Sequence, residues 1–242
     1  MGLKQVTAIT AILMSPLAMA ESKDWSGEAE LGVLKTTGNT EETNVNGRLG
    51  LVHEVTEWRN IGDFRSAYSE AEDETTTERY RADLETNYKF DENRYWFLRG
   101  GYEDDRFSGY DFQSSATTGY GHRLMNWGER SFLDLSAGLG YRFNKLEEPD
   151  EDGNRDEEEA IARLAAQFDF ALSETSLFRQ KLSSEIGLDE NNVITESETS
   201  LQASVVGNLS LKVAYRVKHV SDAPPDSDDT DTETSLTLLY GF

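Results

Sequence analysis

The chain of 242 residues contains no cysteine, which excludes disulfide bonds and thiolate metal sites. It has no apolar run of the roughly 20 residues that a membrane-spanning helix requires, which argues against a helical membrane protein. Its 23 basic and 46 acidic residues give a formal net charge of −23, which disfavours nucleic acid as a partner. The three histidines, His53, His122 and His219, have no metal-ligand spacing. We therefore expect neither a metal centre nor a cofactor.

The N-terminus has the features of a secretory signal peptide. Lys4 supplies a positive charge, a mostly apolar stretch follows, and an A-x-A cleavage site ends at Ala20. The apolar stretch is too short to serve as a membrane anchor. We predict that residues 1–20 are removed on export and that residues 21–242 form a single mature domain.

The mature chain repeats short segments in which apolar and polar side chains alternate. Tyr80, Ala82 and Leu84 share one face of such a segment, whereas Arg81 and Asp83 share the other. This period of two is typical of a β-strand with two different faces. We count twelve segments, which begin near Trp25, Thr43, Asn60, Glu78, Tyr95, Ser114, Ser131, Glu159, Ser176, Ser197, Leu209 and Thr232.

An even number of strands of this length predicts an all-β fold, a transmembrane antiparallel up-and-down β-barrel of about twelve strands. Residues 157–172 also have helical spacing, but the neighbouring segments favour a strand there. His122 and Gln180 fall on the predicted lipid face, so we expect them near a membrane interface. Alternation alone does not distinguish this barrel from a soluble β-protein, which would bury the apolar faces instead.

The last segment, residues 232–242, reads T-E-T-S-L-T-L-L-Y-G-F. Leu236, Leu238, Tyr240 and Phe242 lie on one face, and the chain stops on the aromatic residue. A terminal strand of this kind resembles the closing strand of bacterial outer-membrane barrels. The resemblance implies that Tyr240 and Phe242 form a signal for the outer-membrane assembly machinery.

Connections between the segments alternate in length. Tight turns are predicted around residues 56–58, 91–93, 126–128, 173–175 and 207–208, and longer, mostly acidic loops at 37–42, 70–77, 104–112, 144–158, 189–196 and 221–231. Short turns on one side and long loops on the other match the periplasmic and extracellular ends of bacterial barrels. All four tryptophans fall at the predicted turn end, where they form a periplasmic aromatic girdle: Trp25, Trp58, Trp96 and Trp127.

The polar strand faces carry charges of both signs, which a barrel would enclose. Such charges must pair or contact water in a low-dielectric wall. They therefore predict either a narrow hydrated channel or an ion-paired plug. The predicted lumen-lining residues are Glu28, Glu30, Arg48, Asp63, Arg65, Arg79, Arg81, Asp83, Glu85, Arg99, Glu103, Arg163, Asp169, Arg179, Lys181, Glu185, Lys212, Arg216 and Glu233.

One acidic loop, residues 147–159, holds nine acidic residues and one arginine. Within it Asp150, Asp152, Asn154 and Asp156 have the alternate spacing of a calcium loop, but Arg155 stands where that loop requires glycine. A solvated, self-repelling loop therefore explains the pattern better than a specific metal site. Non-specific attraction of divalent cations, shared with lipopolysaccharide phosphates, needs no special geometry.

A lipid-active enzyme at the membrane rim is an alternative to a passive barrel. His122 is the candidate base for such an enzyme, and it needs a serine within hydrogen-bond reach. Ser131 and Ser173 lie in predicted turns, but no spacing connects either of them to His122. The Gly138-Leu139-Gly140 run lies inside a strand with no helix after it, which argues against nucleotide binding.

Residues 25–40 read W-S-G-E-A-E-L-G-V-L-K-T-T-G-N-T. The pattern W-x-G…L-G…T-T-G-N-T resembles the start of the salt-induced outer-membrane protein family, whose domain has no assigned function. The resemblance extends over the mature chain, including the final Y-G-F. It implies an outer-membrane barrel connected with the response to salt or osmotic stress, and it implies no catalytic residues.

We therefore expect a non-enzymatic barrel of the bacterial outer membrane, with a role in envelope integrity or in passive passage of ions and small solutes. Its expected partners are outer-membrane lipid, lipopolysaccharide, the assembly machinery, and divalent cations at the acidic loops. A lipid-modifying rim enzyme and a soluble periplasmic ligand-binding protein are the alternatives.

Overall fold

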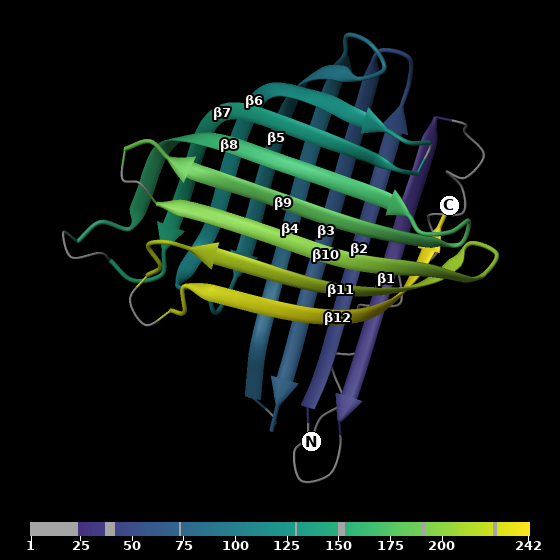
Figure 1. Ribbon diagram of the computed structural model, residues 1–242. Helices are drawn as coiled ribbons and strands as arrows, with labels where there is room; N and C mark the ends of the chain where they lie inside the picture. The colour runs from purple at the N-terminus through teal and green to yellow at the C-terminus, as the bar shows by residue number, and fades with distance from the viewer. Residues whose placement is uncertain are drawn as a thin grey trace.

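The computed structural model describes residues 24–36, 42–72, 74–128, 130–149, 153–189, 192–224 and 227–242. Within these ranges the chain forms a closed barrel of twelve antiparallel strands, in which sequence neighbours pair and β1 pairs with β12 (Figure 1). The described residues include no helix that is long and apolar enough to cross a bilayer. The predicted fold class is confirmed, whereas the predicted signal peptide, residues 1–20, lies outside the described residues.

Each predicted strand start lies within four residues of the observed one. The segment with helical spacing is a strand, β8, because two hydrogen-bonded neighbours, β7 and β9, pair along most of its length. The strands are β1 (Trp25–Thr36), β2 (Glu42–Glu54), β3 (Trp58–Ala71), β4 (Glu74–Lys89), β5 (Arg94–Asp105), β6 (Tyr110–Asn126), β7 (Phe132–Leu146), β8 (Asp156–Ala171), β9 (Ser176–Gly187), β10 (Val193–Val206), β11 (Leu209–Val220) and β12 (Thr230–Gly241).

The two faces of the barrel wall differ as their alternation predicts. On the outer face, Leu84 is 69% exposed and Leu139 is 63% exposed. On the inner face, Asn87, Arg142 and Asp169 are almost completely buried. Apolar side chains outside and charged side chains inside are the reverse of what a soluble β-protein requires. The arrangement is that of a barrel whose exterior contacts lipid.

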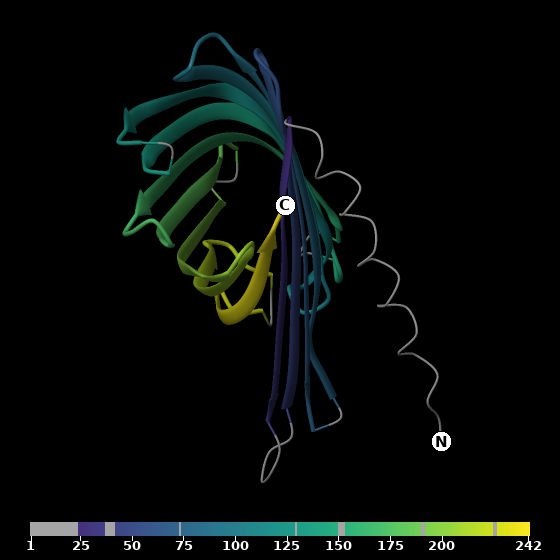
Figure 2. The ribbon, with the colours of Figure 1, turned by 90° about the vertical axis from the view of Figure 1, so that its right-hand side faces the viewer.

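The two longest connections, residues 147–155 and 221–229, lie at one end of the barrel, and every connection at the other end has at most five residues. The even-numbered strands all end at the same end of the barrel, which we call the turn side. We call the opposite end the loop side. The predicted loop at residues 70–77 is wrong, because β3 runs to Ala71 and β4 begins at Glu74. Consecutive threonines at the start of β4 favour extended backbone, and Glu72 makes the tight turn with a φ of 53°. The loop-side ends of β1–β4 consequently extend past β12 (Figure 2).

The seam that closes the barrel is much shorter than the other strand pairings. β1 pairs with β2 from Trp25 to Thr36, but its register with β12 covers only Glu28 to Leu31. At the turn side Gly27 and Phe242 add two backbone hydrogen bonds of 2.8 and 2.9 Å. The Phe242 ring occupies the space that a Cβ atom on Gly27 would need. The last residue of the chain is therefore part of the closure.

We expect replacement of Gly27 by leucine to weaken this seam, because the new side chain displaces the Phe242 ring. Overpacking of this kind costs about 1–3 kcal/mol. Thermal unfolding of the refolded barrel in detergent should show a lower melting temperature for Gly27→Leu. Gly100→Leu is the matched control, since no atom lies within 4 Å of a Cβ placed at Gly100. Equal melting temperatures for the two variants would contradict the role of Phe242.

Candidate functional site

The inner wall carries rows of like charges that the strand register creates. Arg48, Arg65 and Arg81 are direct cross-strand partners on β2, β3 and β4. Asp63 and Asp83 are direct partners in the adjacent row toward the turn side. Like charges placed directly opposite each other destabilise a sheet, so each row requires charges of the other sign close by.

Ion pairs between the two rows provide this compensation within the wall. Arg48 Nη2 lies 2.6 Å from Asp63 Oδ2, and Arg65 Nε lies 2.6 Å from Asp63 Oδ1. Arg81 Nε lies 2.8 Å from Asp83 Oδ2. Arg99 of β5 also pairs with Asp83. Each aspartate therefore joins two arginines, and the rows stabilise each other.

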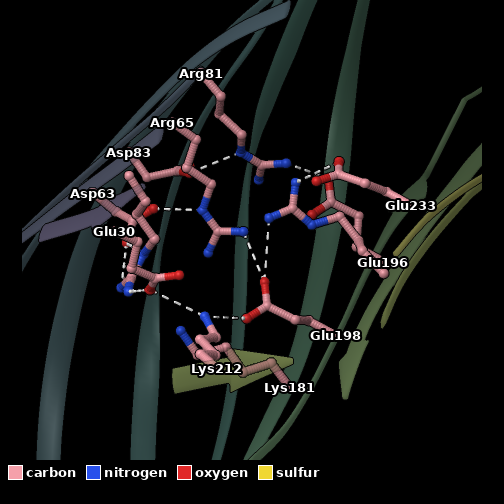
Figure 3. Close-up of polar contacts among 12 residues, drawn as sticks. Glu30, Asp63, Arg65, Arg81, Asp83, Lys181, Glu196, Glu198, Lys212 and Glu233 are labelled. Carbon is pink, nitrogen blue, oxygen red and sulfur yellow. Dashed lines mark hydrogen bonds and ion pairs between the residues drawn. The ribbon is translucent and has the colours of Figure 1, made fainter. Parts of the chain in front are cut away.

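Further ion pairs cross the lumen from one wall to the other (Figure 3). Arg65 Nη1 donates to Glu198 Oε2 on β10 at 2.8 Å, and Arg81 Nη1 donates to Glu196 Oε1 on β10 at 2.6 Å. Arg79 of β4 pairs with Glu233 of β12. The two walls of the barrel are thus connected through their side chains. We call Arg48, Asp63, Arg65, Arg81, Asp83, Glu196 and Glu198 the ion-pair belt.

Lysines of β11 extend these connections around the barrel. Lys212 Nζ lies 3.1 Å from Glu30 Oε1 and 3.5 Å from Glu198 Oε1. Lys218 Nζ donates to Glu103 Oε1 on β5 at 2.5 Å. Removing one member of such a buried pair leaves the other charge without compensation. The lumen charges therefore act as a connected network.

The belt divides the lumen into unequal cavities. A cavity of about 460 Å³ lies on the turn side, between the belt and residues such as Arg59 and Arg123. Two smaller cavities of about 60 and 50 Å³ lie toward the loop side. Arg81 lines all three cavities. The geometry is that of an ion-paired constriction with a chamber on one side.

Two aromatic side chains of β5 also point into the chamber. Glycines of β6 and β7 make room for them, since a Cβ on Gly121 would collide with the Tyr95 ring and one on Gly138 with the Phe97 ring. Tyr95 donates from its hydroxyl to Asp134 Oδ1 at 2.7 Å, and Phe97 is 1% exposed. Neither ring was among the predicted lumen residues, although Tyr95 and Phe97 share the strand face of Arg99 and Glu103, which were. The glycines at alternate positions of β6 and β7 are a second signal that could have indicated them.

The predicted lumen residues outside the belt all lie on the inner wall. Glu28 pairs with Arg48 at 2.9 Å, and Arg179 pairs with Asp169 at 2.6 Å. Glu185 accepts a hydrogen bond from the Ser115 hydroxyl at 3.2 Å. Glu85 accepts one from Asn87 at 3.0 Å.

Glu196, Glu198 and Lys218 belong to the charge network but were not among the predicted lumen residues. Glu196 precedes the predicted start of its strand at Ser197, so it was assigned to a loop. The alternation of β10 and β11 does place Glu198 and Lys218 on the polar faces, which was the available signal.

The four predicted girdle tryptophans lie at the turn side and are exposed. Trp25 and Trp58 are the first residues of β1 and β3, Trp96 is the third residue of β5, and Trp127 directly follows β6. Their exposed fractions range from 38% to 57%. The rings of Tyr240 and Phe242, the predicted assembly signal, stack on each other with their centroids 6.4 Å apart.

Within the described residues, the candidates for chemistry other than passage do not form a common site. Asp150 and Asp152 lie outside the described residues. Among the residues that the structure does describe, no group of three or more acidic or histidine side chains could hold a metal ion. Asn154 and Asp156 lie at the loop side, before and at the start of β8. The ring centroids of His122 and Tyr120 lie 6.3 Å apart. Ser131 instead accepts a hydrogen bond from the Ala171 N–H at 2.9 Å.

Gln180 shows how an amide is accommodated on the outer wall. Its Nε2 donates to Ser197 at 2.9 Å, and its Oε1 accepts from Thr199 at 2.5 Å. Hydrogen bonding to β10 therefore reduces the cost of placing this amide toward lipid.

A family model described as "Protein of unknown function, DUF481" matches residues 29–242. The chain belongs to this family. Uncharacterized protein YdiY of Escherichia coli (strain K12) is 26% identical over 224 residues, which cover 91% of this chain and 84% of YdiY. Among solved structures, the NanC porin has a TM-score of 0.51 at 10% identity, covering 89% of this chain and 97% of that one. The translocator domain of autotransporter NalP from Neisseria meningitidis has a TM-score of 0.47 at 10% identity, covering 90% and 86%. The likeness to the NanC porin agrees with the closed barrel of this DUF481 protein.

The cross-lumen pair of Arg65 and Glu198 should contribute measurably to stability. A hydrogen bond to a charged group contributes about 1.5–3 kcal/mol, and both side chains are mostly buried. We expect a double-mutant cycle with Arg65→Gln and Glu198→Gln to give a coupling energy in this range in thermal or denaturant unfolding. The exposed pair of Asp91 and Arg94 is the control and should couple less. A coupling no larger than that of the control would show that the belt does not hold the walls together.

Proposed function

We propose that this DUF481 protein is an outer-membrane barrel through which ions and small solutes pass passively, with the ion-pair belt as its constriction. The cross-lumen contacts of Arg65 and Arg81 with β10 carry this proposal, since they leave small spaces rather than a wide pore. Twelve strands enclose less space than the 16–18 strands of wide porins. Passage is therefore restricted to ions and small solutes.

The proposed location is the bacterial outer membrane, reached through the signal peptide of residues 1–20. The apolar outer face, the tryptophans at the turn side and the terminal Phe242 support this location. The turn side would then contact the periplasm and the loop side the exterior. Lipid, lipopolysaccharide, the assembly machinery and, at the acidic loop of residues 147–159, divalent cations are the proposed partners.

Salt should act directly on the constriction, which supports a role under salt or osmotic stress. The Debye length falls from about 10 Å at 0.1 M salt to about 3 Å at 1 M. Ions that enter the lumen screen the pairs of Arg65 and Arg81, so the walls are held together less firmly at high salt. Conductance should consequently rise more steeply with salt than the conductivity of the bulk solution.

The activity we propose is non-enzymatic. The rim-enzyme alternative requires a serine that hydrogen-bonds to His122, and the described residues contain no such contact. No observation favours this alternative, so passive passage is the function that the lumen supports best.

Planar-bilayer recording with the mature chain tests the proposal. We expect small conductance steps for the wild type and severalfold larger steps for the double variant Arg81→Ser/Glu196→Ser, because the variant removes a cross-lumen pair and shortens both side chains. The matched control is Asp91→Ser/Arg94→Ser at a periplasmic turn. The pKa of Asp91 lies below its ordinary value because the Arg94 side chain and nearby backbone N–H groups donate to it, so this control also removes a fully charged pair.

The absence of conductance in both the wild type and the belt variant, at every voltage and salt concentration, would contradict passage. Equal conductance steps in the wild type and the belt variant would contradict the belt as the constriction.

A further inference from the structure

The turn-side cavity has a charge balance opposite to that of the whole chain. Nine Arg or Lys side chains and seven Asp or Glu side chains line it, whereas the chain has a formal net charge of −23. The cavity of about 460 Å³ lies within the range of about 300–1,000 Å³ that small-molecule sites occupy.

The acids at the cavity wall are already engaged. Asp63, Asp83, Glu196 and Glu198 belong to the ion-pair belt, where arginines neutralise them. Asp134 pairs with an arginine and also accepts a hydrogen bond from a tyrosine.

The remaining two acids at the wall have partners as well. Glu54 pairs with Lys89 at 2.8 Å, and Glu85 accepts a hydrogen bond from Asn87 at 3.0 Å. Every acid that lines the cavity therefore has a hydrogen-bond donor, and six of the seven pair with a cation.

The cations at the wall are not all engaged, and Lys181 is the strongest case. Its side chain forms no ion pair or hydrogen bond with the described residues, and Figure 3 draws no contact from it to the side chains around it. Arg179, Arg48 and Arg65 repel it, while Glu198 and Asp63 attract it. Glu198 itself already contacts three other cations, so it neutralises less of the charge on Lys181.

Two arginines from other strands also keep donors free. Arg59 of β3 forms no ion pair within the described chain; its guanidinium lies 5.3 Å from the Tyr95 ring centroid, and its buried Nε has no hydrogen-bond partner. Arg163 of β8 approaches Glu185 only at 3.8 Å, which is too long for a hydrogen bond. Three strands thus present unsatisfied cationic donors to one cavity.

We infer that this cavity binds a small multivalent oxyanion, a carboxylate or phosphate compound, through Lys181, Arg59 and Arg163. The inference rests on the proposed function and names the class of solute that the barrel binds on the turn side of its constriction. Arginine offers paired N–H donors that match carboxylate and phosphate geometry, and lysine adds a point charge. An oxyanion would supply the acceptors that these donors lack in the protein itself.

Citrate is a suitable probe, with sodium chloride of equal ionic strength as the reference. We expect citrate to raise the melting temperature of the mature barrel in detergent more than sodium chloride does, because a ligand that binds only the folded state stabilises it. Calorimetric titration should give a citrate affinity that Lys181→Gln and Arg59→Gln each weaken by about tenfold or more. Arg106→Gln removes the same charge from an exposed loop-side position and should leave the affinity unchanged.

The Lys181→Gln variant should fold, because it removes a buried cation that has no partner. Its melting temperature without citrate should equal or exceed that of the wild type. Equal effects of citrate and sodium chloride on the wild type would overturn the inference, and so would an unchanged citrate affinity in Lys181→Gln.

Binding and conductance separate this inference from the proposed function. A barrel that conducts but prefers cations in a salt gradient and does not bind citrate overturns the oxyanion site and leaves passage intact. A barrel that binds citrate through Lys181 but never conducts supports the oxyanion site and overturns passage.

Discussion

Closure of the hydrogen-bonded cylinder is the constraint on which the rest of this structure depends. Lipid offers no hydrogen-bonding partner, so an open sheet edge in a membrane leaves backbone groups unsatisfied. Closure also determines which strand faces are enclosed, because each strand has an apolar and a charged face. The short seam between β1 and β12 is therefore the critical part of the wall. The contact of Phe242 with Gly27 gives the chain terminus a structural role in that seam.

Enclosing the charged faces creates both the constriction and the chamber. The register aligns arginines with arginines and aspartates with aspartates, so compensation comes from the adjacent row and from the opposite wall. Where opposite walls reach each other, as between Arg81 and Glu196, the lumen narrows. On the turn side of this contact, the glycines of β6 and β7 leave space for the rings of Tyr95 and Phe97. The turn-side cavity lies there. One strand pattern thus produces two distinct regions of the lumen.

The sequence predicted the barrel well because alternation and turn spacing are local properties. It predicted the site only in part, because a contact such as Arg65 with Glu198 joins strands that meet only after closure. Glu196 was missed because the local pattern does not show how far β10 extends. Tyr95 and Phe97 were not named as lumen residues, although they share the strand face of Arg99 and Glu103, which were. The glycines that make room for the two rings lie on neighbouring strands, so their role depends on the register.

The central claim is that apolar faces contact lipid while charged faces are enclosed, and adjacent positions of one strand test it most directly. The chain contains no cysteine, so single-cysteine variants can be labelled without background. Leu84 is 69% exposed on the outer face, and its neighbour Glu85 lines the turn-side cavity. A fluorescent label on Leu84→Cys in lipid vesicles should be quenched by lipid-soluble quenchers, and a label on Glu85→Cys by water-soluble ones. The reverse result would contradict the inside-out barrel and the proposals that rest on it.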